Sequence, residues 1–208
     1  MSNDNAITRV FKLWAKISMM VVDGTRDATT VAEALQNILN QPTRHWREED
    51  GVIYFSVTSD NESGEGWIKR LEAKGYRVSD YTKSVLHSPD FKPTNGVTTK
   101  IAVLKGSIFE DSDRITQNIR AEADKRGLTK PDAEVACLIR DQFSDEEVEA
   151  MGLWWIVAMH EPIKDSDGGP NLLGAGRSDD GRWLDVCCGD PDCRWDREFG
   201  FAVAVLQV

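Results

Sequence analysis

The chain has 208 residues and 40% apolar content, enough to bury the core of one large domain or of one domain with a smaller companion. Its 35 acidic and 25 basic residues give a formal charge of -10. The acids are spread along the chain, as on a solvated surface, and they argue against a nucleic-acid backbone as the main partner.

Residues 1–42 predict a helical hairpin. Apolar residues recur at helical spacing in two runs that are separated by Asp23-Gly-Thr-Arg-Asp27, and Pro42 closes the second run. The runs are Ile7, Val10, Phe11, Trp14, Ile17 and Val21, then Val31, Ala32, Leu35, Ile38 and Leu39. These apolar stripes need a partner, so we expect the hairpin to pack on the main body or on a second copy in a homo-oligomer.

The first helix predicts neither a membrane span nor a signal peptide. Lys12, Lys16 and Ser18 interrupt its longest apolar stretch, and no small-residue cleavage site follows it. Cytoplasmic localisation is therefore the expectation. Cysteines stay reduced in that compartment, so we expect no disulfide framework among Cys137, Cys187, Cys188 and Cys193.

Residues 43–96 predict a small mixed α/β segment, either separate or part of the main domain. A charged stretch leads into a strand at 52–57, and two short helices follow, one ending at Gly75 and the other beginning at Ser79. The Gly64-Glu-Gly66 element lacks the third glycine of a dinucleotide-binding loop, so we interpret it as a turn.

Residues 97–208 predict the main domain. A strand or bent hairpin at 97–109 precedes a helix that opens at Ser112-Asp113 and a second that opens at Thr129-Lys-Pro131. Ser144 and Glu147 have the spacing of a capping box. Strands are expected at 153–160, 182–186 and 199–206, separated by long loops rich in Asp and Gly, and the last is apolar enough to lie mid-sheet.

This order of elements resembles the C-type lectin-like fold over residues 97–208. In that family a Trp-Ile-Gly-Leu strand follows the second helix, and Trp155-Ile-Val-Ala158 has the same place here. The Gly-Arg-Trp-Leu strand ending at Leu184 and the Gly-Phe-Ala-Val strand beginning at Gly200 complete the pattern. The resemblance implies an α+β protein in which the helical hairpin precedes a domain of two helices and a small antiparallel sheet.

Within that fold the chain is similar to the variable proteins of diversity-generating retroelements, whose hypervariable residues come from mutated adenines in a template copy. A randomised asparagine codon yields Asp, Gly, Ser, Cys and Phe among others, and such residues crowd positions 174–199. The resemblance implies that the following residues form a variable ligand-binding surface: Gly176, Ser178, Asp179, Asp180, Asp185, Cys187, Cys188, Asp190, Asp192, Cys193, Asp196 and Phe199. It implies fixed scaffold positions at Trp155, Trp183, Trp195 and Phe201.

On this interpretation the acidic protein is a non-catalytic binder without cofactor or metal. Its ligand is expected to be a protein surface that carries positive charge opposite the acids of the terminal segment. The clustered cysteines are then chance products of randomised codons. A scaffold protein with no site in this segment is the third, plainer alternative.

Two cysteine chemistries compete with this interpretation. Cys188 and Cys193 have a permissible spacing for zinc, but a structural site needs four ligands, and only Cys187 and His160 could add to the pair. The chain also resembles formylglycine-generating enzymes, which hold copper with two cysteines near the C-terminus. Nearby acids disfavour that activity because a negative field raises a thiol pKa.

Calcium and acid–base catalysis are the remaining alternatives. Glu161-Pro162-Ile163 and Trp195-Asp196-Arg197 are incomplete versions of the calcium elements of sugar-binding lectins, and solvated turn acids explain Asp165 and Asp167 better. His160 beside Glu161 lacks a nucleophile at a recognisable spacing, so we interpret it as a satisfied hydrogen-bonding residue.

Overall fold

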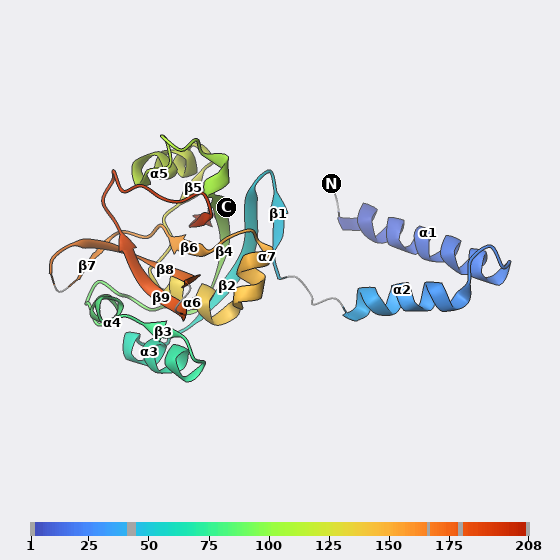
Figure 1. The fold of residues 1–208 in the computed structure, drawn as a ribbon, viewed down its shortest axis with the longest axis horizontal. Helices are drawn as coiled ribbons and strands as arrows, with labels where there is room; N and C mark the ends of the chain where they lie inside the picture. The colour runs from blue at the N-terminus through green and yellow to red at the C-terminus, as the bar shows by residue number, and fades with distance from the viewer. Residues whose placement is uncertain (1–2, 41–44, 166, 179–180, 207–208) are drawn as a thin grey trace. The chain divides into compact units, whose positions relative to one another are not determined.

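The computed structural model describes residues 3–40, 45–165, 167–178 and 181–206, and it divides into two compact units at residue 45. The first unit is a pair of helices, α1 (Asn3–Val22) and α2 (Ala28–Asn40), so the predicted helical hairpin is confirmed (Figure 1). Pro42, which was expected to close it, lies outside the described residues. In the described part of the chain no helix is long and apolar enough to cross a membrane.

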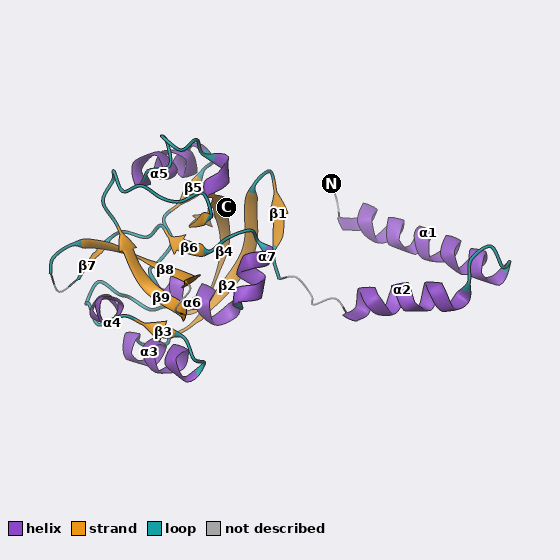
Figure 2. Cartoon of the chain, in the orientation of Figure 1, coloured by secondary structure: helices purple, strands orange, loops and turns teal. Residues whose placement is uncertain are grey.

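The second unit is a sheet with helices packed around it (Figure 2). Its helices are α3 (Gly64–Ala73), α4 (Asp80–Leu86), α5 (Thr116–Lys125), α6 (Glu134–Gln142) and α7 (Asp145–Ala150). Its strands are β1 (Arg47–Glu49), β2 (Val52–Asp60), β3 (Arg77–Val78), β4 (Asn95–Lys105), β5 (Leu128–Thr129), β6 (Trp155–Ala158), β7 (Ile163–Lys164), β8 (Pro170–Ser178), β9 (Gly181–Cys188) and β10 (Phe199–Val205).

The sheet runs in the order β1-β2-β4-β10-β6-β8-β9-β3, with β5 beside β10 and β7 beside β8. The prediction that the last strand lies mid-sheet is confirmed, because β10 is flanked by β4 and β6. The expected small antiparallel sheet is wrong in size and direction. The described residues build one ten-stranded mixed sheet, in which β10 pairs parallel with β6 and β3 parallel with β9. Residues 52–60 join it because β2 pairs with β4.

Strand β8 is the longest element that the sequence did not predict, and the short strands β1, β3, β5 and β7 were not predicted either. The residues of β8 fall in the segment expected to be a loop, since Pro170, Gly174 and Gly176 are residues that strands usually lack. Tertiary pairing overrides that preference. β8 lies antiparallel to β6 on one side and to β9 on the other, and residues 171–176 are all buried.

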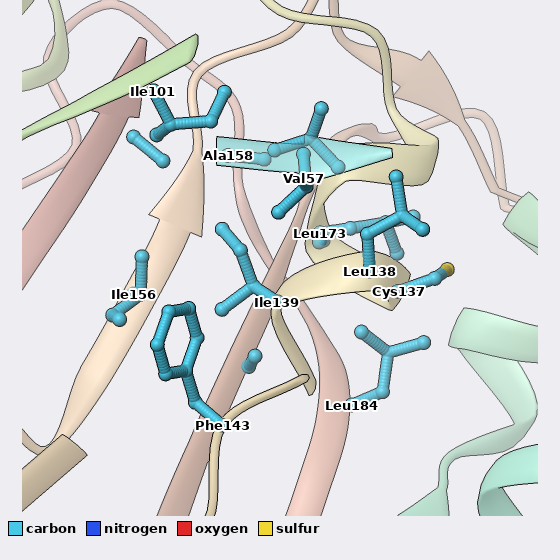
Figure 3. Packing of buried hydrophobic residues seen from close by; sticks show 14 of the residues in the cluster. Val57, Ile101, Cys137, Leu138, Ile139, Phe143, Ile156, Ala158, Leu173 and Leu184 are labelled. Carbon is cyan, nitrogen blue, oxygen red and sulfur yellow. The ribbon is translucent and has the colours of Figure 1, made fainter. Parts of the chain in front are cut away.

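Two apolar clusters cover the two faces of the sheet. The larger lies under α3, α4 and α6, and Figure 3 shows Ile139 and Phe143 from the α6 region packed toward Ile156 of β6. The smaller contains Ile119 of α5 together with Val157 and Phe201. Because side chains alternate along a strand, neighbouring residues of β6 and β10 belong to different clusters.

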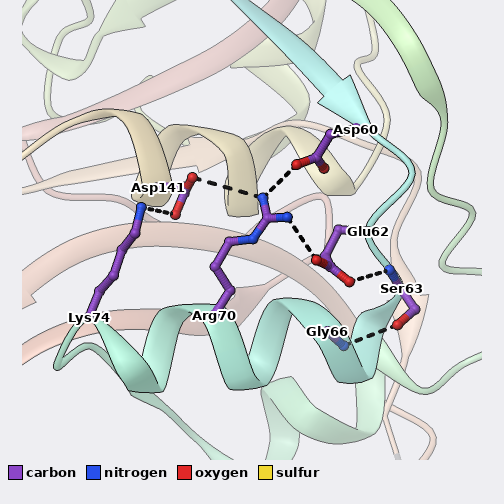
Figure 4. A network of polar contacts seen from close by, with 7 residues as sticks. All are labelled: Asp60, Glu62, Ser63, Gly66, Arg70, Lys74 and Asp141. Carbon is purple, nitrogen blue, oxygen red and sulfur yellow. Dashed lines mark hydrogen bonds and ion pairs between the residues drawn. The ribbon is translucent and has the colours of Figure 1, made fainter.

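Charged side chains tie the covering helices to the sheet. Figure 4 shows Arg70 of α3 paired with Asp60 and Glu62, each at 2.7 Å, and with Asp141 of α6 at 4.0 Å. Fully buried Arg140 donates hydrogen bonds to the Gly176 carbonyl of β8 at 3.1 Å and to the Phe143 carbonyl at 2.7 Å. Arg140 therefore fixes β8 against α6.

The predicted capping box is confirmed at the start of α7. The amide of Glu147 donates to Ser144 Oγ, and the amide of Ser144 donates to the carboxylate of Glu147. These reciprocal bonds satisfy amides that a helix start leaves free.

Candidate binding surface

Strand β9 presents alternate side chains to the two faces of the sheet, and one of these faces is the proposed surface. Trp183, Asp185 and Cys187 share one side of the strand and are partly buried. Leu184, on the other side, is fully buried in the larger apolar cluster. The partners of the first set on β8 include Gly176 opposite Trp183 and Gly174 opposite Asp185. On this face, β8 carries no side chain at its two glycines, whereas β9 carries the side chains of Trp183 and Asp185.

Trp155 lies over these two glycines. A Cβ added at Gly176 would come within 2.3 Å of Trp155 Cδ2, and one added at Gly174 would come within 3.4 Å of Trp155 Cε3. The indole stacks on Phe199, with ring centroids 6.3 Å apart and planes 26° from parallel. Gly176 therefore leaves the space that the Trp155 ring occupies. Because Gly176 is buried, it offers no side chain to a ligand.

The loop at 189–198 crosses from β9 to β10 and is anchored along the start of α5. The amides of Thr116 and Gln117 donate to the carbonyls of Cys193 and Pro191 at 3.1 and 2.8 Å. The indole of Trp195, nearly buried, donates to Thr116 Oγ1 at 3.0 Å. The path of the loop is therefore set by these backbone and tryptophan contacts together with the Cys188–Cys193 disulfide, and its acidic side chains take no part in them.

Arg114 also holds this loop, through contacts with the backbone of Trp195. Its buried guanidinium donates to the carbonyls of Gly106 at 3.0 Å and Phe109 at 3.1 Å, and it lies 3.4 Å from the Trp195 carbonyl oxygen. The amide of Trp195 in turn donates to the Arg114 carbonyl at 3.0 Å. Sequence reasoning missed Arg114, because nothing in its neighbourhood distinguishes a buried arginine from a surface one.

The exposed side chains of the loop are mainly acidic. Asp190, Asp192 and Asp196 are all exposed, as is Glu198. Arg194 and Arg197 are exposed between them, so residues 190–198 hold four acids and two bases and carry a net charge of -2. Such a rim favours a cationic partner and is screened by salt.

Cys188 and Cys193 form a disulfide with their Cα atoms 6.2 Å apart, a usual separation for such a bond. The expectation that the terminal cysteines remain reduced is therefore wrong. The cause is geometric. The chain turns at Pro191, so Cys193 comes back beside Cys188 at the end of β9. Cys137 and Cys187 are free.

The disulfide bears on metal chemistry at this loop. Cys188, Asp190 and Cys193 place three potential ligand atoms within 4.8 Å of one another. With the two sulfurs bonded to each other, the Asp190 carboxylate is the one anionic ligand that this group retains. Structural zinc needs four ligands, and copper(I) favours thiolates. The group in its disulfide state fits neither ion.

The contacts of Asp185 and Cys187 lie within the fold and hold β9 in place. The Asp185 carboxylate accepts hydrogen bonds from the hydroxyls of Ser79 and Thr82 and from the amide of Val186 at 2.8 Å. It therefore links β9 to the first turn of α4. Cys187 packs against the smaller apolar cluster, and burial raises the pKa of its thiol to about 12, which removes it as a nucleophile at neutral pH.

His160 is a structural residue, as the sequence interpretation held. Its ring is buried, Nε2 accepts from the Leu173 amide at 2.9 Å, and Nδ1 lies 2.6 Å from the Glu161 carbonyl oxygen. Nδ1 therefore carries the proton. Burial lowers the pKa of His160 to about 4, so the ring is neutral at pH 7 and both nitrogens are used.

Asp165 and Asp167 were interpreted as turn residues in preference to calcium ligands, and the structure places them in a turn. Asp165 accepts hydrogen bonds from Asn171 Nδ2 at 2.7 Å and from the amides of Asp167 and Gly169 at 2.9 and 3.0 Å. The bond from Asn171 is the main cause of the lowered pKa of Asp165. Its carboxylate is occupied in holding the turn before β8.

The variable positions expected from the sequence thus fall into four groups. Exposed positions are Ser178, Cys188, Asp190, Asp192 and Asp196, and partly buried ones are Asp185, Cys187, Cys193 and Phe199. Gly176 is buried, and Asp179 and Asp180 lie outside the described residues. Of the scaffold positions, Trp195 and Phe201 are buried, whereas Trp155 and Trp183 are partly buried.

The exposed residues do not form one continuous patch. Ser178 lies at the β8–β9 turn, whereas Cys188 lies at the other end of β9, roughly 20 Å away for a strand of that length. The face of β9 and the loop at 189–198 connect the two ends. The exposed Trp154, half of whose surface is accessible, is an aromatic that alternation with Trp155 allowed the sequence to anticipate.

Comparison with known proteins identifies no relative. No family model, no curated protein and no solved structure matches the chain.

Proposed function

We propose that this chain is a non-catalytic binding protein whose surface at 174–199 is diversified by a retroelement and recognises a protein ligand. The observation that carries the proposal is that buried residues hold the backbone of this segment, whereas other residues are exposed to solvent. Trp195 and Leu184 are buried and hold the backbone, while Asp190, Asp192 and Asp196 project from a loop whose path does not depend on them. A segment built in this way tolerates many side chains at its exposed positions.

The order of elements supports the C-type lectin-like part of the proposal. β4, α5, α6, β6, β9 and β10 follow one another as in that family, and the Trp155-Ile-Val-Ala158 strand comes after the second helix. Two departures weigh against a simple correspondence. α7 and β8 are additional, and the sheet continues through β2 to β1.

The experiment is to sequence this gene and its flanking DNA across many cells of the source population. Substitutions should fall at adenine-containing codons for exposed residues such as Asp190, Asp192 and Asp196, and codons for Leu184 and Trp195 should not vary. A near-copy of the segment should lie beside a reverse-transcriptase gene. A uniform 3′ end without a template copy would refute the retroelement.

The adjacent sulfurs of Cys188 and Cys193 keep one enzymatic alternative open, a copper and thiol enzyme that resembles the formylglycine-generating class. It predicts that copper copurifies with the reduced protein and that Cys188→Ser or Cys193→Ser abolishes turnover. The binding proposal predicts instead that these variants bind no less metal than wild type and change affinity for a single ligand.

A further inference from the structure

The helical hairpin α1–α2 has too little core of its own. At residues 8–37, where the structure describes the side chains, every side chain is exposed or partly buried. The best covered are Ile17, Met20, Val21, Val31 and Leu35, and all of these except Val21 line one groove between the two helices. An isolated helix of 13 residues, the length of α2, is marginal in water, and the apolar stripes of both helices are mostly exposed, so we expect an apolar partner to stabilise the hairpin.

The hairpin carries both halves of a self-complementary interface. Near its turn, a groove of about 590 Å³ has an apolar part formed by both helices, including Ile17, Val31 and Leu35, and a polar end at the turn, formed by Thr25, Arg26, Asp27 and Thr30. Within the two turns of α1 that precede the groove, Phe11 and Trp14 are 67% and 53% exposed. An antiparallel pair of hairpins related by a two-fold axis would place the aromatic rings of each copy against the groove of the other.

Charge also favours a second copy over a charged partner. The hairpin at 3–40 holds four bases, Arg9, Lys12, Lys16 and Arg26, and four acids, Asp4, Asp23, Asp27 and Glu33. Its net charge is therefore zero, and the whole charge of -10 belongs to the rest of the chain. The hairpin is thus the part of this acidic protein where two copies meet without net repulsion.

α1 exposes apolar area on one broad side. Val10, Phe11, Leu13 and Trp14 are each exposed by about half or more, and at about 100° per residue they lie within about 160° of the helix circumference. They present roughly 450 Å² per chain, more than half of the about 800 Å² per partner in a standard interface, and the groove residues add to this area. Met19 is also exposed but lies opposite Val10, so it is not counted.

We propose that two copies of this chain associate through α1 and α2 into an antiparallel four-helix bundle. Each bundle then carries two of the surfaces described above, so a ligand that presents repeated sites is held with an avidity that one chain lacks. The dimer does not depend on the proposed binding function, because its interface lies in a different unit.

Light scattering of the full chain during size-exclusion chromatography tests the proposal. The expected mass is twice that of one chain, and Phe11→Glu or Trp14→Glu should give the mass of one chain. Leu206→Glu is the matched control, because Leu206 is 57% exposed in the other unit and its replacement should leave the dimer intact. A wild-type mass of one chain, or of three or more, overturns the proposal.

Helicity measured against concentration separates self-association from packing on the same chain. The mean residue ellipticity at 222 nm should become more negative as protein concentration rises, in step with the fraction of dimer, because the hairpin becomes more helical when two copies associate. Concentration-independent helicity in a monomer would mean that the hairpin packs on its own second unit, and would refute the bundle. This measurement on the wild type holds even where Phe11→Glu lowers expression.

Discussion

Gly176→Ala tests the space that Gly176 leaves for the Trp155 ring at the centre of the proposed surface. The added Cβ would lie 2.3, 2.6 and 2.6 Å from three atoms of the Trp155 ring, well inside contact distance. The ring must move by about 1 Å, and its stacking on Phe199 opposes the movement. Overpacking of this kind costs about 3 kcal/mol, and the smaller entropy of the unfolded alanine chain returns about 1 kcal/mol.

The expected net loss in the free energy of unfolding is therefore about 2 kcal/mol, a fall in Tm of roughly 6 °C. Urea denaturation followed by tryptophan fluorescence measures it. Gly174→Ala is the matched control on the same strand and face. Its nearest contacts would be Cys187 Sγ at 3.1 Å and Trp155 at 3.4 Å, which small shifts relieve, so its stability should stay within about 0.5 kcal/mol of wild type.

Trp155→Leu provides the coupling measurement. A smaller side chain at 155 removes the clash, so the substitution should cost less in the Gly176→Ala background than in the wild type, as expected for residues in contact. Equal costs in the two backgrounds, or a Gly176→Ala protein as stable as wild type, would refute the placement of the indole over β8. They would also return Gly176 to the set of positions that can vary freely.

Four further predictions concern stability, redox state and binding. His160 has a folded pKa of about 4 against an ordinary value of 6.5, so its neutral form stabilises the fold above pH 6.5; we expect about 3 kcal/mol to be lost as pH falls to 4, and His160→Gln to flatten that part of the measured stability profile. Replacing both Cys188 and Cys193 with serine should lower the free energy of unfolding by about 2 kcal/mol through loss of a short loop closure, and equal urea midpoints for oxidised and reduced wild type would contradict this. Alkylation and mass measurement of protein from its source cells should find Cys188 and Cys193 protected as a disulfide, whereas two alkylated cysteines would contradict the bond and agree with the reduced thiols of a cytoplasmic protein. Changing Asp190, Asp192 and Asp196 together to Asn should leave Tm within about 2 °C and weaken binding to a basic protein selected as a ligand, most strongly at low salt, whereas unchanged binding would remove the acidic rim from the interface.

Local chemistry determined much of the architecture from the sequence alone. The hairpin α1–α2 follows from apolar residues at helical spacing, and the start of α7 follows from Ser144 and Glu147, whose side chains satisfy amides within three residues of each other. β10 could be placed mid-sheet because a strand that is apolar on nearly every residue must be covered on both faces. In each case the cause lies within one segment.

What only the tertiary structure decided depends on contacts between distant segments. β8 contains proline and glycines, so its strand conformation comes from pairing with β6 and β9, and its glycines have meaning only once Trp155 lies over them. The Cys188–Cys193 bond and the engagement of Asp185 by Ser79, more than a hundred positions away, have the same origin. A residue's type and neighbours in sequence fix its local preferences, whereas the group that it faces across the fold is set by how the whole chain packs.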